Sequence, residues 1–348
     1  MAKHLLIDGK IIYPNKLKLK KNINLAFIGS GDIAKKHADV VLSFNHKIKT
    51  LLTKSKSIKT NSFKKKYKVE SHFTNINLFK KNIIDKKIHA IIVCVNWEES
   101  NKVFKNLFDL NIPILFEKSL KMNSLELDKL NNKYNLNNFY FAYNRNYYDF
   151  IPYLSFKHKR YFPEIVLFNL PDTFEKIINK RGDKIIPYLT KYITSHWISF
   201  FYIYLKILGI SIDKNFNNID IDRLEIKKSR LLKIFIKNKF NLVFIITLVP
   251  NNASNIKVEI FSNKMNFIIE PFEKLRIFNK LNMKKIKGNN IFSPNNNFEC
   301  TVDHKFKPGF RSQYYDFINL NFTDNYKSLQ SIKVKDLIVI YKICELLN

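Results

Sequence analysis

A short glycine-rich stretch near the start of the chain has the residue types that bind a dinucleotide. It follows an apolar run at 23–28 and consists of Gly29, Ser30, Gly31, Asp32, Ile33 and Ala34. A strand entering this turn and a helix leaving it would aim free backbone N–H groups and the positive end of the helix dipole at a pyrophosphate. The chain has only 7 glycines, so two of them this close together indicate a backbone that approaches a ligand. An ordinary strand–turn–helix joint is the alternative.

A pair of opposite charges, Glu117-Lys118, follows another apolar segment at 113–116. Ligands of open parallel sheets bind outside the carboxyl ends of the strands. We therefore expect the pair to face the same crevice as the glycine-rich turn, which predicts a reaction site beside a dinucleotide site. A solvated surface pair is the alternative.

Two patterns of elements would position these residues. In the first, apolar segments at 48–52, 89–95, 113–116 and 139–143 alternate with helical segments, which predicts a parallel sheet with helices between its strands. In the second, after about residue 150, strand-like segments follow closely at 164–170, 231–236, 242–249, 256–261 and 265–270. These predict a mostly antiparallel sheet, with a final helix at about 334–347. We expect the asparagine-rich tract at 289–297 to be a mobile loop.

The charge of the chain is strongly positive but is not arranged for nucleic-acid recognition. Lys and Arg number 60 against 29 Asp and Glu, for a formal net charge of +31. Most of the excess is lysine and is spread along the chain, and the dense runs at 16–21 and 64–68 lack interleaved arginines and aromatic residues. We therefore expect no specific nucleic-acid partner, although the positive field would favour an anionic ligand.

The cysteines and the apolar segments indicate the cellular compartment of the protein and whether it spans a membrane. Cys94, Cys300 and Cys344 are widely spaced, which predicts neither a disulfide framework nor a metal site and suits a reducing cytoplasm. The apolar stretch at 185–210 is interrupted by Lys191, His196 and Lys206, so it falls short of the about 20 apolar residues that span a bilayer. We expect a buried helix there and no signal peptide before residue 21.

In the order and spacing of its motifs, the chain resembles the Gfo/Idh/MocA family of pyridine-nucleotide oxidoreductases from about residue 22 onward. Beyond the turn, the strand at 90–95 and Glu117-Lys118, the resemblance rests on His37, Tyr143-Asn144-Arg145, Ser195-His196, Leu208-Gly209, Gly309-Phe310, Gln313 and Phe317. It implies an α/β fold with an N-terminal Rossmann domain, a doubly wound parallel sheet, and a C-terminal α/β domain with an open, mostly antiparallel sheet. The expected division is an extension at 1–21, a dinucleotide-binding domain at 22–145 and a substrate and oligomerisation domain at 146–348.

The resemblance also implies an activity and a set of site residues. Family members generally oxidise or reduce a hydroxyl or keto carbon of a sugar, cyclitol or nucleotide-sugar, here with a possible setting in surface-polysaccharide metabolism. Lys118 would hydrogen-bond the reacting oxygen and help relay its proton, with His196 as its partner from the second domain. Arg145 would join these two residues in binding the substrate. The expected cofactor-binding residues are Gly29, Gly31, Asp32, Ile33, Ala34, Thr53, Lys54, Ser55, Val95, Asn96, Glu117 and Asn144.

Three positions depart from the family pattern. Ser119 stands where many members have proline after Glu-Lys, and Asn96-Trp97 replaces a pair that is commonly Thr-Pro. Tyr192 stands four residues before His196, where many dehydrogenases of the family have Asp. Because residues four apart share a helical face, the Tyr192 phenol would either take over proton transfer or shape the pocket.

The end of the second strand bears on the choice of cofactor. A site that prefers NAD usually has a carboxylate there for the adenosine ribose hydroxyls, whereas this chain has Thr53, Lys54 and Ser55. A lysine and two hydroxyls suit a 2′-phosphate, so we expect NADP to bind better than NAD.

Two functions of different class stay open at this stage. The first is a cytoplasmic sugar or nucleotide-sugar oxidoreductase that forms homo-oligomers through the C-terminal sheet. The second is a nucleotide-binding family member that has lost redox chemistry and acts as a sensor or assembly subunit, as the missing Asp at position 192 would allow. The sequence does not specify the sugar, and Arg145, Arg181 and Lys184 only suggest an anionic group on it.

Overall fold

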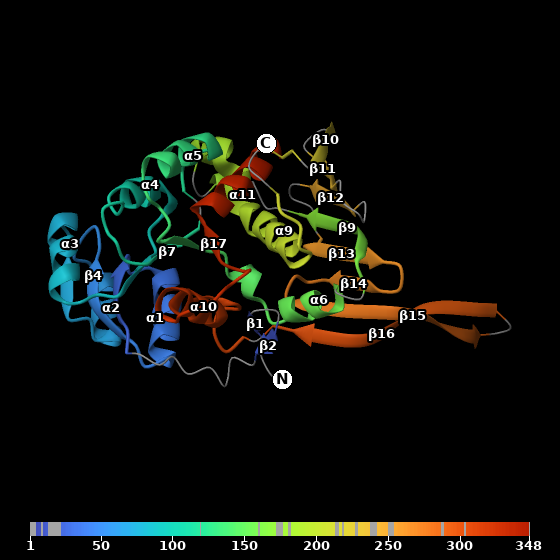
Figure 1. Cartoon of the computed structure of the whole chain (residues 1–348), viewed down its shortest axis with the longest axis horizontal. Helices are drawn as coiled ribbons and strands as arrows, with labels where there is room; N and C mark the ends of the chain where they lie inside the picture. The colour runs from blue at the N-terminus through green and yellow to red at the C-terminus, as the bar shows by residue number, and fades with distance from the viewer. Residues whose placement is uncertain are drawn as a thin grey trace. The chain divides into compact units, whose positions relative to one another are not determined.

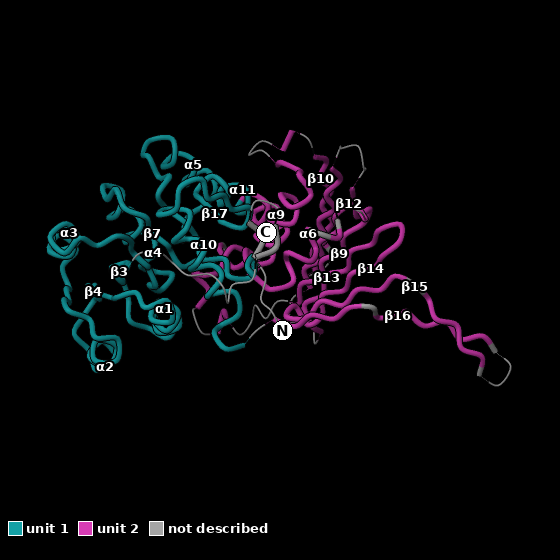
Figure 2. Tube along the Cα trace, turned by 60° about the horizontal axis from the view of Figure 1, so that its bottom comes forward, with its two compact units in different colours: residues 1–147, 303–341 teal, residues 148–302, 342–348 magenta. Residues whose placement is uncertain are grey.

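The computed structural model divides the chain into two compact units (Figure 2). Unit 1 comprises residues 1–147 and 303–341, and unit 2 comprises residues 148–302 and 342–348. The structure describes residues 5–7, 10–12, 22–118, 120–158, 161–171, 177–179, 182–212, 216–217, 219–226, 229–236, 242–249, 254–286, 289–302 and 304–347. Most of the expected extension at 1–21, together with Ser119 and Arg181, lies outside these ranges.

Unit 1 is built on a parallel sheet of seven strands. Its elements are β3 (Asn24–Ile28), α1 (Asp32–Ser43), β4 (Lys47–Leu52), α2 (Ile58–Tyr67), β5 (Ser71–Phe73), α3 (Ile76–Asp85), β6 (Ala90–Val93), α4 (Trp97–Lys105), β7 (Ile114–Glu117), α5 (Ser124–Lys133), β8 (Phe139–Ala142), the 3-10 helix η2 (Asn144–Tyr147), α10 (Phe310–Phe322), β17 (Ile332–Lys333) and α11 (Val334–Leu346), whose last residues belong to unit 2. The strand order is β17-β8-β7-β6-β3-β4-β5, and only β17 runs antiparallel to its neighbour. A short antiparallel pair, β1 (Leu5–Ile7) and β2 (Lys10–Ile12), precedes this sheet.

Helices cover both faces of the parallel sheet. Residues of α1, α2 and α10 form one buried cluster with β3, β4 and β6. Successive residues of a strand point to opposite faces, and on β7 Leu115 belongs to this cluster whereas Phe116 packs edge-on against Phe104 of α4, 5.8 Å between ring centroids. The strands are therefore apolar on both sides, as the continuous run at 90–93 predicts.

Unit 2 is built on a sheet of eight strands that is antiparallel except at one pair. Its elements are α6 (Ile151–His158), β9 (Pro163–Leu170), the 3-10 helix η3 (Asp183–Tyr188), α8 (Leu189–Ile193), α9 (Ser195–Ile207), β10 (Ile219–Ile226), β11 (Ser229–Ile236), β12 (Leu242–Leu248), β13 (Lys257–Ser262), β14 (Asn266–Ile269), β15 (Lys274–Ile286) and β16 (Asn289–Thr301). The strand order is β10-β11-β12-β9-β13-β14-β15-β16, and β12 and β9 are the parallel pair.

The core of unit 2 lies between α9 and one face of this sheet. Phe201 of α9 packs edge-on against Phe244 of β12 and Phe168 of β9, with ring centroids 4.6 and 5.9 Å apart. Burial alternates along β12, as expected for a strand with one face toward a core. β15 and β16 extend beyond the other strands as a two-stranded arm (Figure 1), where Leu281, Met283 and Phe292 are exposed.

These observations confirm the predicted fold class and change two expectations. The asparagine-rich tract is not a loop: it forms β16, which pairs antiparallel with β15, so pairing outweighs the low strand preference of asparagine. The segment 303–341, which we placed in the second domain, groups with unit 1, because the aromatic face of α10 joins the core around α1.

No helix among the described residues is long and apolar enough to cross a membrane. The stretch at 185–210 is divided among η3, α8 and α9, and the residues of α9 from Ser195 to Leu205 are buried.

Candidate functional site

The glycine-rich turn joins β3 to α1 at the carboxyl edge of the unit 1 sheet. Gly29 has a φ of 98°, and a Cβ added there would collide with the carbonyl oxygen of Cys94, which follows β6. Its N–H donates to the carbonyl of Leu52 at 2.8 Å, so the turn also contacts the end of β4. Only glycine fits this position, since it combines a left-handed conformation with a close backbone approach.

Gly31 differs from Gly29, because the space beside it is open and its backbone does not exclude other residues. Its φ is −71°, it is the N-cap of α1, and an added Cβ would meet no atom within 4 Å. No side chain caps this helix end. The uncapped N–H groups and the open space suit the pyrophosphate of a dinucleotide.

A groove of about 570 Å³ runs along this edge of unit 1. Seven of the expected cofactor-binding residues line it: Gly29, Gly31, Thr53, Lys54, Ser55, Val95 and Asn96. Five do not line it: Asp32, Ile33 and Ala34, which form the first turn of α1, and Glu117 and Asn144. Ala34 is buried in the core, where its small side chain lets α1 pack on the sheet.

The groove also contains polar residues that we did not single out from the sequence, among them Ser57, Thr60, Glu99 and Lys102. Ser57 and Glu99 carried a signal in the sequence, because both stand at helix starts. Ser57 caps α2 by accepting from the N–H of Thr60, and Asn96 caps α4 by accepting from the N–H of Glu99 at 3.1 Å. Asn96, a departure from the family pattern, thus has a structural role.

At the end of the groove that follows β4, Lys54 forms an ion pair with Glu99 at 3.3 Å. The Lys54 side chain is 86% exposed and the Glu99 side chain 37%. Thr53 Oγ1 donates to the carbonyl of Ser55 at 2.8 Å and lies 2.7 Å from His72 Nε2, so the loop after β4 is held to β5. The loop itself has no carboxylate, as we expected, but α4 supplies one opposite the lysine.

At the other end of the same sheet edge, Glu117 of β7 bonds to His37 of α1. Glu117 Oε1 and His37 Nε2 are 2.9 Å apart, with side-chain exposures of 15% and 1%. The His37 ring stacks on Phe310 of α10, 4.3 Å between centroids. Burial raises the pKa of Glu117, but the hydrogen bond and charge of His37, with the charges of Lys307 and Lys118, outweigh it and lower the pKa overall. Glu117 is therefore held as a carboxylate.

Lys118 follows Glu117 at the end of β7, and its backbone N–H donates to Glu117 Oε2 at 3.3 Å. Two other predicted residues follow β8 on η2. The Asn144 amide donates to the carbonyl of Pro308 at 2.8 Å, so it holds the segment 304–308. Arg145, beside it, is among the charges that act on Lys307. Glu117, Lys118 and Arg145 thus lie at the carboxyl ends of neighbouring strands.

The remaining predicted catalytic residues belong to unit 2. Tyr192 is half-buried on α8, and His196 is 8% exposed on α9. The backbone hydrogen bonds continue across the joint, from Thr194 N to Thr190 O at 2.7 Å and from Ile198 N to Thr194 O at 3.1 Å. The four-residue spacing of Tyr192 and His196 therefore remains helical.

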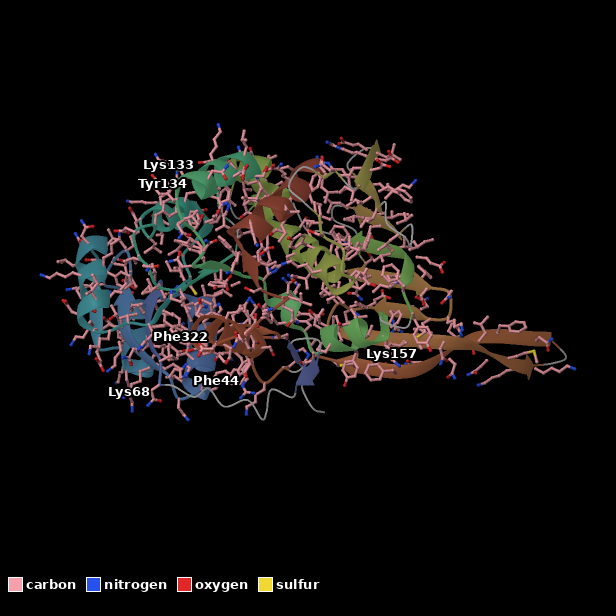
Figure 3. All side chains as sticks on the ribbon, in the orientation of Figure 1. Phe44, Lys68, Lys133, Tyr134, Lys157 and Phe322 are labelled. Carbon is pink, nitrogen blue, oxygen red and sulfur yellow. The ribbon has the colours of Figure 1, made fainter. Side chains whose placement is uncertain are left out.

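The described part of the chain contains no candidate metal site. No group of three or more His, Cys, Asp or Glu side chains in it could hold a metal ion. The blue nitrogen tips of the basic side chains are spread over the elements of both units (Figure 3), as the sequence predicts for solvated faces.

Comparison with known proteins finds a family match for most of unit 1, the unit with the parallel sheet. Residues 23–136 match the family model of Gfo/Idh/MocA proteins, an oxidoreductase family with an NAD-binding Rossmann fold. No curated protein sequence matches the chain at a significant level.

Solved structures share the fold over nearly the whole chain. A Gfo/Idh/MocA family oxidoreductase from Vibrio cholerae has a TM-score of 0.65 at 11% identity, covering 93% of this chain and 96% of its own. A UDP-N-acetylglucosamine 3-dehydrogenase from Acidithiobacillus ferrooxidans has a TM-score of 0.66 at 10% identity, covering 94% and 97%. A myo-inositol 2-dehydrogenase from Lactobacillus plantarum has a TM-score of 0.65 at 15% identity, covering 93% and 96%. The resemblance predicted from the motifs is confirmed: residues 23–136 match the Gfo/Idh/MocA oxidoreductase family model, and the chain has the two-domain fold of solved members of that family.

Proposed function

We propose that the protein is an NADP-preferring oxidoreductase that acts on a hydroxyl or keto carbon of a sugar, cyclitol or nucleotide-sugar. One observation carries the proposal: the glycine turn, its groove and the Glu117-Lys118 pair lie on one carboxyl edge of a parallel sheet. The names of the solved relatives, which include an inositol and a UDP-sugar dehydrogenase, support the substrate class.

The residues present fit a dinucleotide. The Gly29–Gly31 turn and the start of α1 would take the pyrophosphate, and Thr53, Lys54 and Ser55 would take the adenosine ribose and its 2′-phosphate. The nicotinamide, when bound, supplies or accepts the hydride. Lys54 is already paired with Glu99, but exposed ion pairs contribute little, so a phosphate can replace the carboxylate at small cost.

The chain's own residues would manage the proton and the charge of the reacting oxygen. Lys118 would donate a hydrogen bond to that oxygen and stabilise its developing negative charge. Glu117, held as a carboxylate by His37, would lie beside Lys118 at the end of β7 and bind near the nicotinamide ribose. His196, with Tyr192 on the same helical face, would take or return the proton.

The first experiment is a fluorescence titration of the purified protein with NADPH and NADH, followed by a screen of sugars and cyclitols for turnover. We expect saturable binding that favours NADPH. Lys118→Ala should abolish turnover while its NADPH affinity stays within about twofold of the parent, because the lysine acts on the substrate oxygen. Lys121→Ala, which removes a nearby lysine that lies over the Trp97 ring instead, is the matched control and should keep activity.

Each adverse result has its own meaning. A folded protein that binds neither nucleotide has lost the cofactor, and the proposal fails. Binding without turnover of any substrate favours the alternative, a nucleotide-binding sensor or assembly subunit, in which Tyr192 replaces the usual acid. A place in surface-polysaccharide metabolism stays a prediction, which the sugar screen addresses.

We also propose a homo-oligomer that pairs through the C-terminal sheet. Large apolar side chains are exposed on this sheet, including Ile165 at 42%, Leu224 at 51% and Phe292 at 60%. A second copy of the sheet, paired with this one, would remove these apolar groups from water. Sedimentation of the protein as a monomer at micromolar concentration would contradict this pairing.

We place the protein in a reducing compartment, the cytoplasm. Cys94 and Cys300 form no disulfide, and burial raises the pKa of both thiols, that of Cys300 to about 11. Thiols of this kind persist where disulfides are kept reduced. Fractionation of the source cells, followed by detection of the protein, tests the location.

A further inference from the structure

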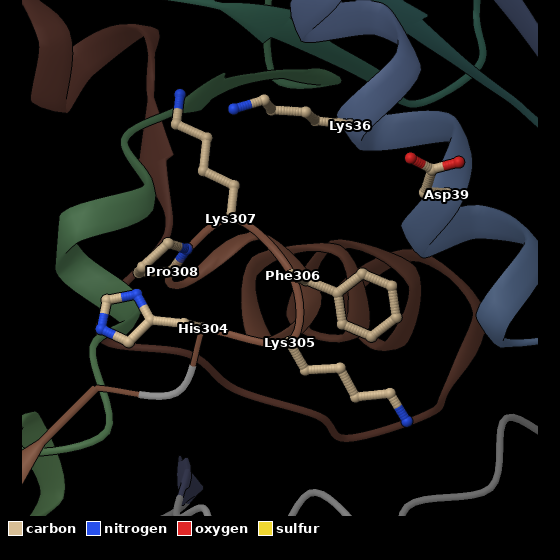
Figure 4. Close-up of a pocket in the computed structure, with 7 residues that line it drawn as sticks. All are labelled: Lys36, Asp39, His304, Lys305, Phe306, Lys307 and Pro308. Carbon is tan, nitrogen blue, oxygen red and sulfur yellow. The ribbon is translucent and has the colours of Figure 1, made fainter.

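A second pocket of unit 1 lies between α1 and the segment 304–308, which precedes α10 (Figure 4). It has a volume of about 530 Å³ and is lined by Lys36 and Asp39 of α1 and by the segment itself. None of its lining residues lines the groove at the glycine turn. The pocket is therefore separate from the groove that would hold the pyrophosphate and the adenosine of the cofactor.

The pocket has an excess of positive charge. Lys36, Lys305 and Lys307 line it, against a single carboxylate, Asp39. That carboxylate is already engaged, because Asp39 Oδ1 accepts from Lys66 at 2.9 Å and from Tyr67 at 3.0 Å. Within the described part of the chain, neither Lys36 nor Lys307 forms an ion pair with a carboxylate.

The ammonium groups of Lys36 and Lys307 extend toward each other across this pocket, whereas His304 and Lys305 point elsewhere (Figure 4). The Lys307 Nζ lies 4.5 Å from the centroid of the Phe310 ring. Burial lowers the pKa of Lys307, the charge of Glu117 opposes this, and the charges of Lys36 and Arg145 lower the pKa further. Lys36 and Arg145 thus both repel Lys307, while the nearby Glu117 carboxylate is already bonded to His37, so a bound anion would offset this repulsion.

The segment that carries Lys307 is fixed in place. The Asn144 amide donates to the carbonyl of Pro308, and Phe310 stacks on His37 just beyond Gly309, whose φ is 79°. These anchors directly follow Lys307 in the chain, and its ammonium lies over the anchored Phe310 ring, so the ammonium is positioned before any ligand arrives. Lys307 also acts electrostatically on Glu117, so the Lys307 ammonium lies near the end of β7, where Lys118 follows Glu117.

We propose that Lys36 and Lys307 bind an anionic group, a carboxylate or a phosphate, of the sugar substrate. The inference rests on the proposed function and further specifies that the sugar substrate is negatively charged. A substrate anion fits better than the cofactor pyrophosphate, because the latter is expected at the N-terminus of α1, whereas Lys36 lies beyond the first turn in a pocket that shares no residue with the groove. Arg145, a predicted substrate ligand, does not line the pocket but is a further cation that acts on Lys307.

The test is calorimetric binding of glucuronate, glucose 6-phosphate and glucose to the full-length protein at 150 mM NaCl, with and without saturating NADPH. We expect at least one of the two anionic sugars to bind at least about tenfold more tightly than glucose, and the preferred one identifies the group as a carboxylate or a phosphate. Lys36→Met and Lys307→Met should each weaken that binding about tenfold and leave the affinity for glucose unchanged. Lys307→Arg, which keeps the charge, should retain most of the affinity.

Lys86→Met is the matched control, because Lys86 is an exposed lysine at the end of α3 and its loss changes the net charge equally. Anionic sugars that bind no better than glucose, or not at all, overturn the inference. So does an equal loss in the Lys86 variant, which would show a general effect of charge. If Lys36→Met and Lys307→Met instead weaken NADPH binding, the anion belongs to the cofactor and the inference is also wrong. Failure of the parent protein to bind NADPH contradicts the proposed function and is recorded separately from the sugar affinities.

Discussion

The centre and the rim of the site on unit 1 are held by different forces. At the centre, Gly29 meets the backbone of Cys94, and Glu117 bonds to a histidine that is 1% exposed. At the rim, Gly31 meets no atom, and Lys54 and Glu99 form an exposed pair. Residues of the centre are fixed by the protein itself, whereas residues of the rim have few internal partners. Substitutions at the centre should therefore change the free energy of unfolding, and substitutions at the rim should change ligand binding alone.

The largest expected effect is that of Gly29→Ala at the centre. A methyl group there collides with the Cys94 carbonyl oxygen and forces a side-chain-bearing residue to adopt a φ of 98°. Both effects act on backbone, which cannot move aside as a flexible side chain would, so we expect a loss of about 3 kcal/mol or more in the free energy of unfolding. Urea denaturation followed by circular dichroism measures it.

Gly31→Ala is the matched control at the rim, two residues along the same turn. With a φ of −71° and open space around it, the alanine should change the free energy of unfolding by less than about 0.5 kcal/mol. NADPH affinity should nevertheless fall at least about tenfold, because the methyl group occupies space that we assign to the pyrophosphate. Equal stabilities of the two variants would contradict the distinction between centre and rim.

Glu117→Gln tests the charge at the centre. The folded-state pKa of Glu117 lies below its ordinary value of 4.5, so the carboxylate contributes stability that is present above about pH 4.5 and is lost as the pH falls through the folded-state pKa. We expect the variant to be less stable than the parent by about 1–3 kcal/mol at pH 7, with a difference that shrinks toward zero in acid. Denaturation midpoints measured from pH 3 to pH 7 give this profile.

Glu99→Gln is the corresponding change at the rim. Its partner Lys54 is 86% exposed, so the pair should contribute less than about 0.5 kcal/mol, and salt should reduce that further. A pH-independent difference for Glu117→Gln, or an equal loss for the two variants, would show that the His37–Glu117 bond does not depend on the carboxylate charge.

The same contrast explains what the sequence could predict. The parallel sheet, the glycine turn and the strands of unit 2 follow from local patterns, namely the apolar run at 90–93, the paired glycines and the alternating burial on β12. Local patterns of this kind specify backbone conformation and one buried face. They therefore locate the turn and seven of the residues that line the groove.

These local patterns could not predict contacts between segments that are distant in sequence. The return of 303–341 to unit 1 depends on Phe310 stacking on His37, and the strand at Asn289–Thr301 depends on pairing with β15. Lys307 and Glu99 likewise gain their significance from neighbours 190 and 45 residues away, Glu117 and Lys54. The sequence does not distinguish such a lysine from the many others, because what distinguishes it is its burial and the charges around it in the folded chain.

Lys54→Asp should change ligand binding and leave stability almost unchanged, so it addresses the rim directly. It removes the cation that we assign to the 2′-phosphate and places a carboxylate where NAD sites usually have one. The ratio of NADPH to NADH affinity should fall at least about tenfold, equivalent to about 1.4 kcal/mol, while the free energy of unfolding changes by less than about 0.5 kcal/mol. Fluorescence titrations with the two nucleotides give the ratio.

Lys56→Asp is the matched control for this change, because it lies two residues away on the same exposed loop and does not line the groove. It alters the net charge by the same amount, so any general effect of the field on the more negative nucleotide should be equal in the two variants. A larger effect of Lys54→Asp assigns the 2′-phosphate to Lys54 itself. An unchanged ratio in Lys54→Asp would mean that Glu99 keeps the lysine paired when the nucleotide binds, and the preference for NADP would then have no structural basis at this end of the groove.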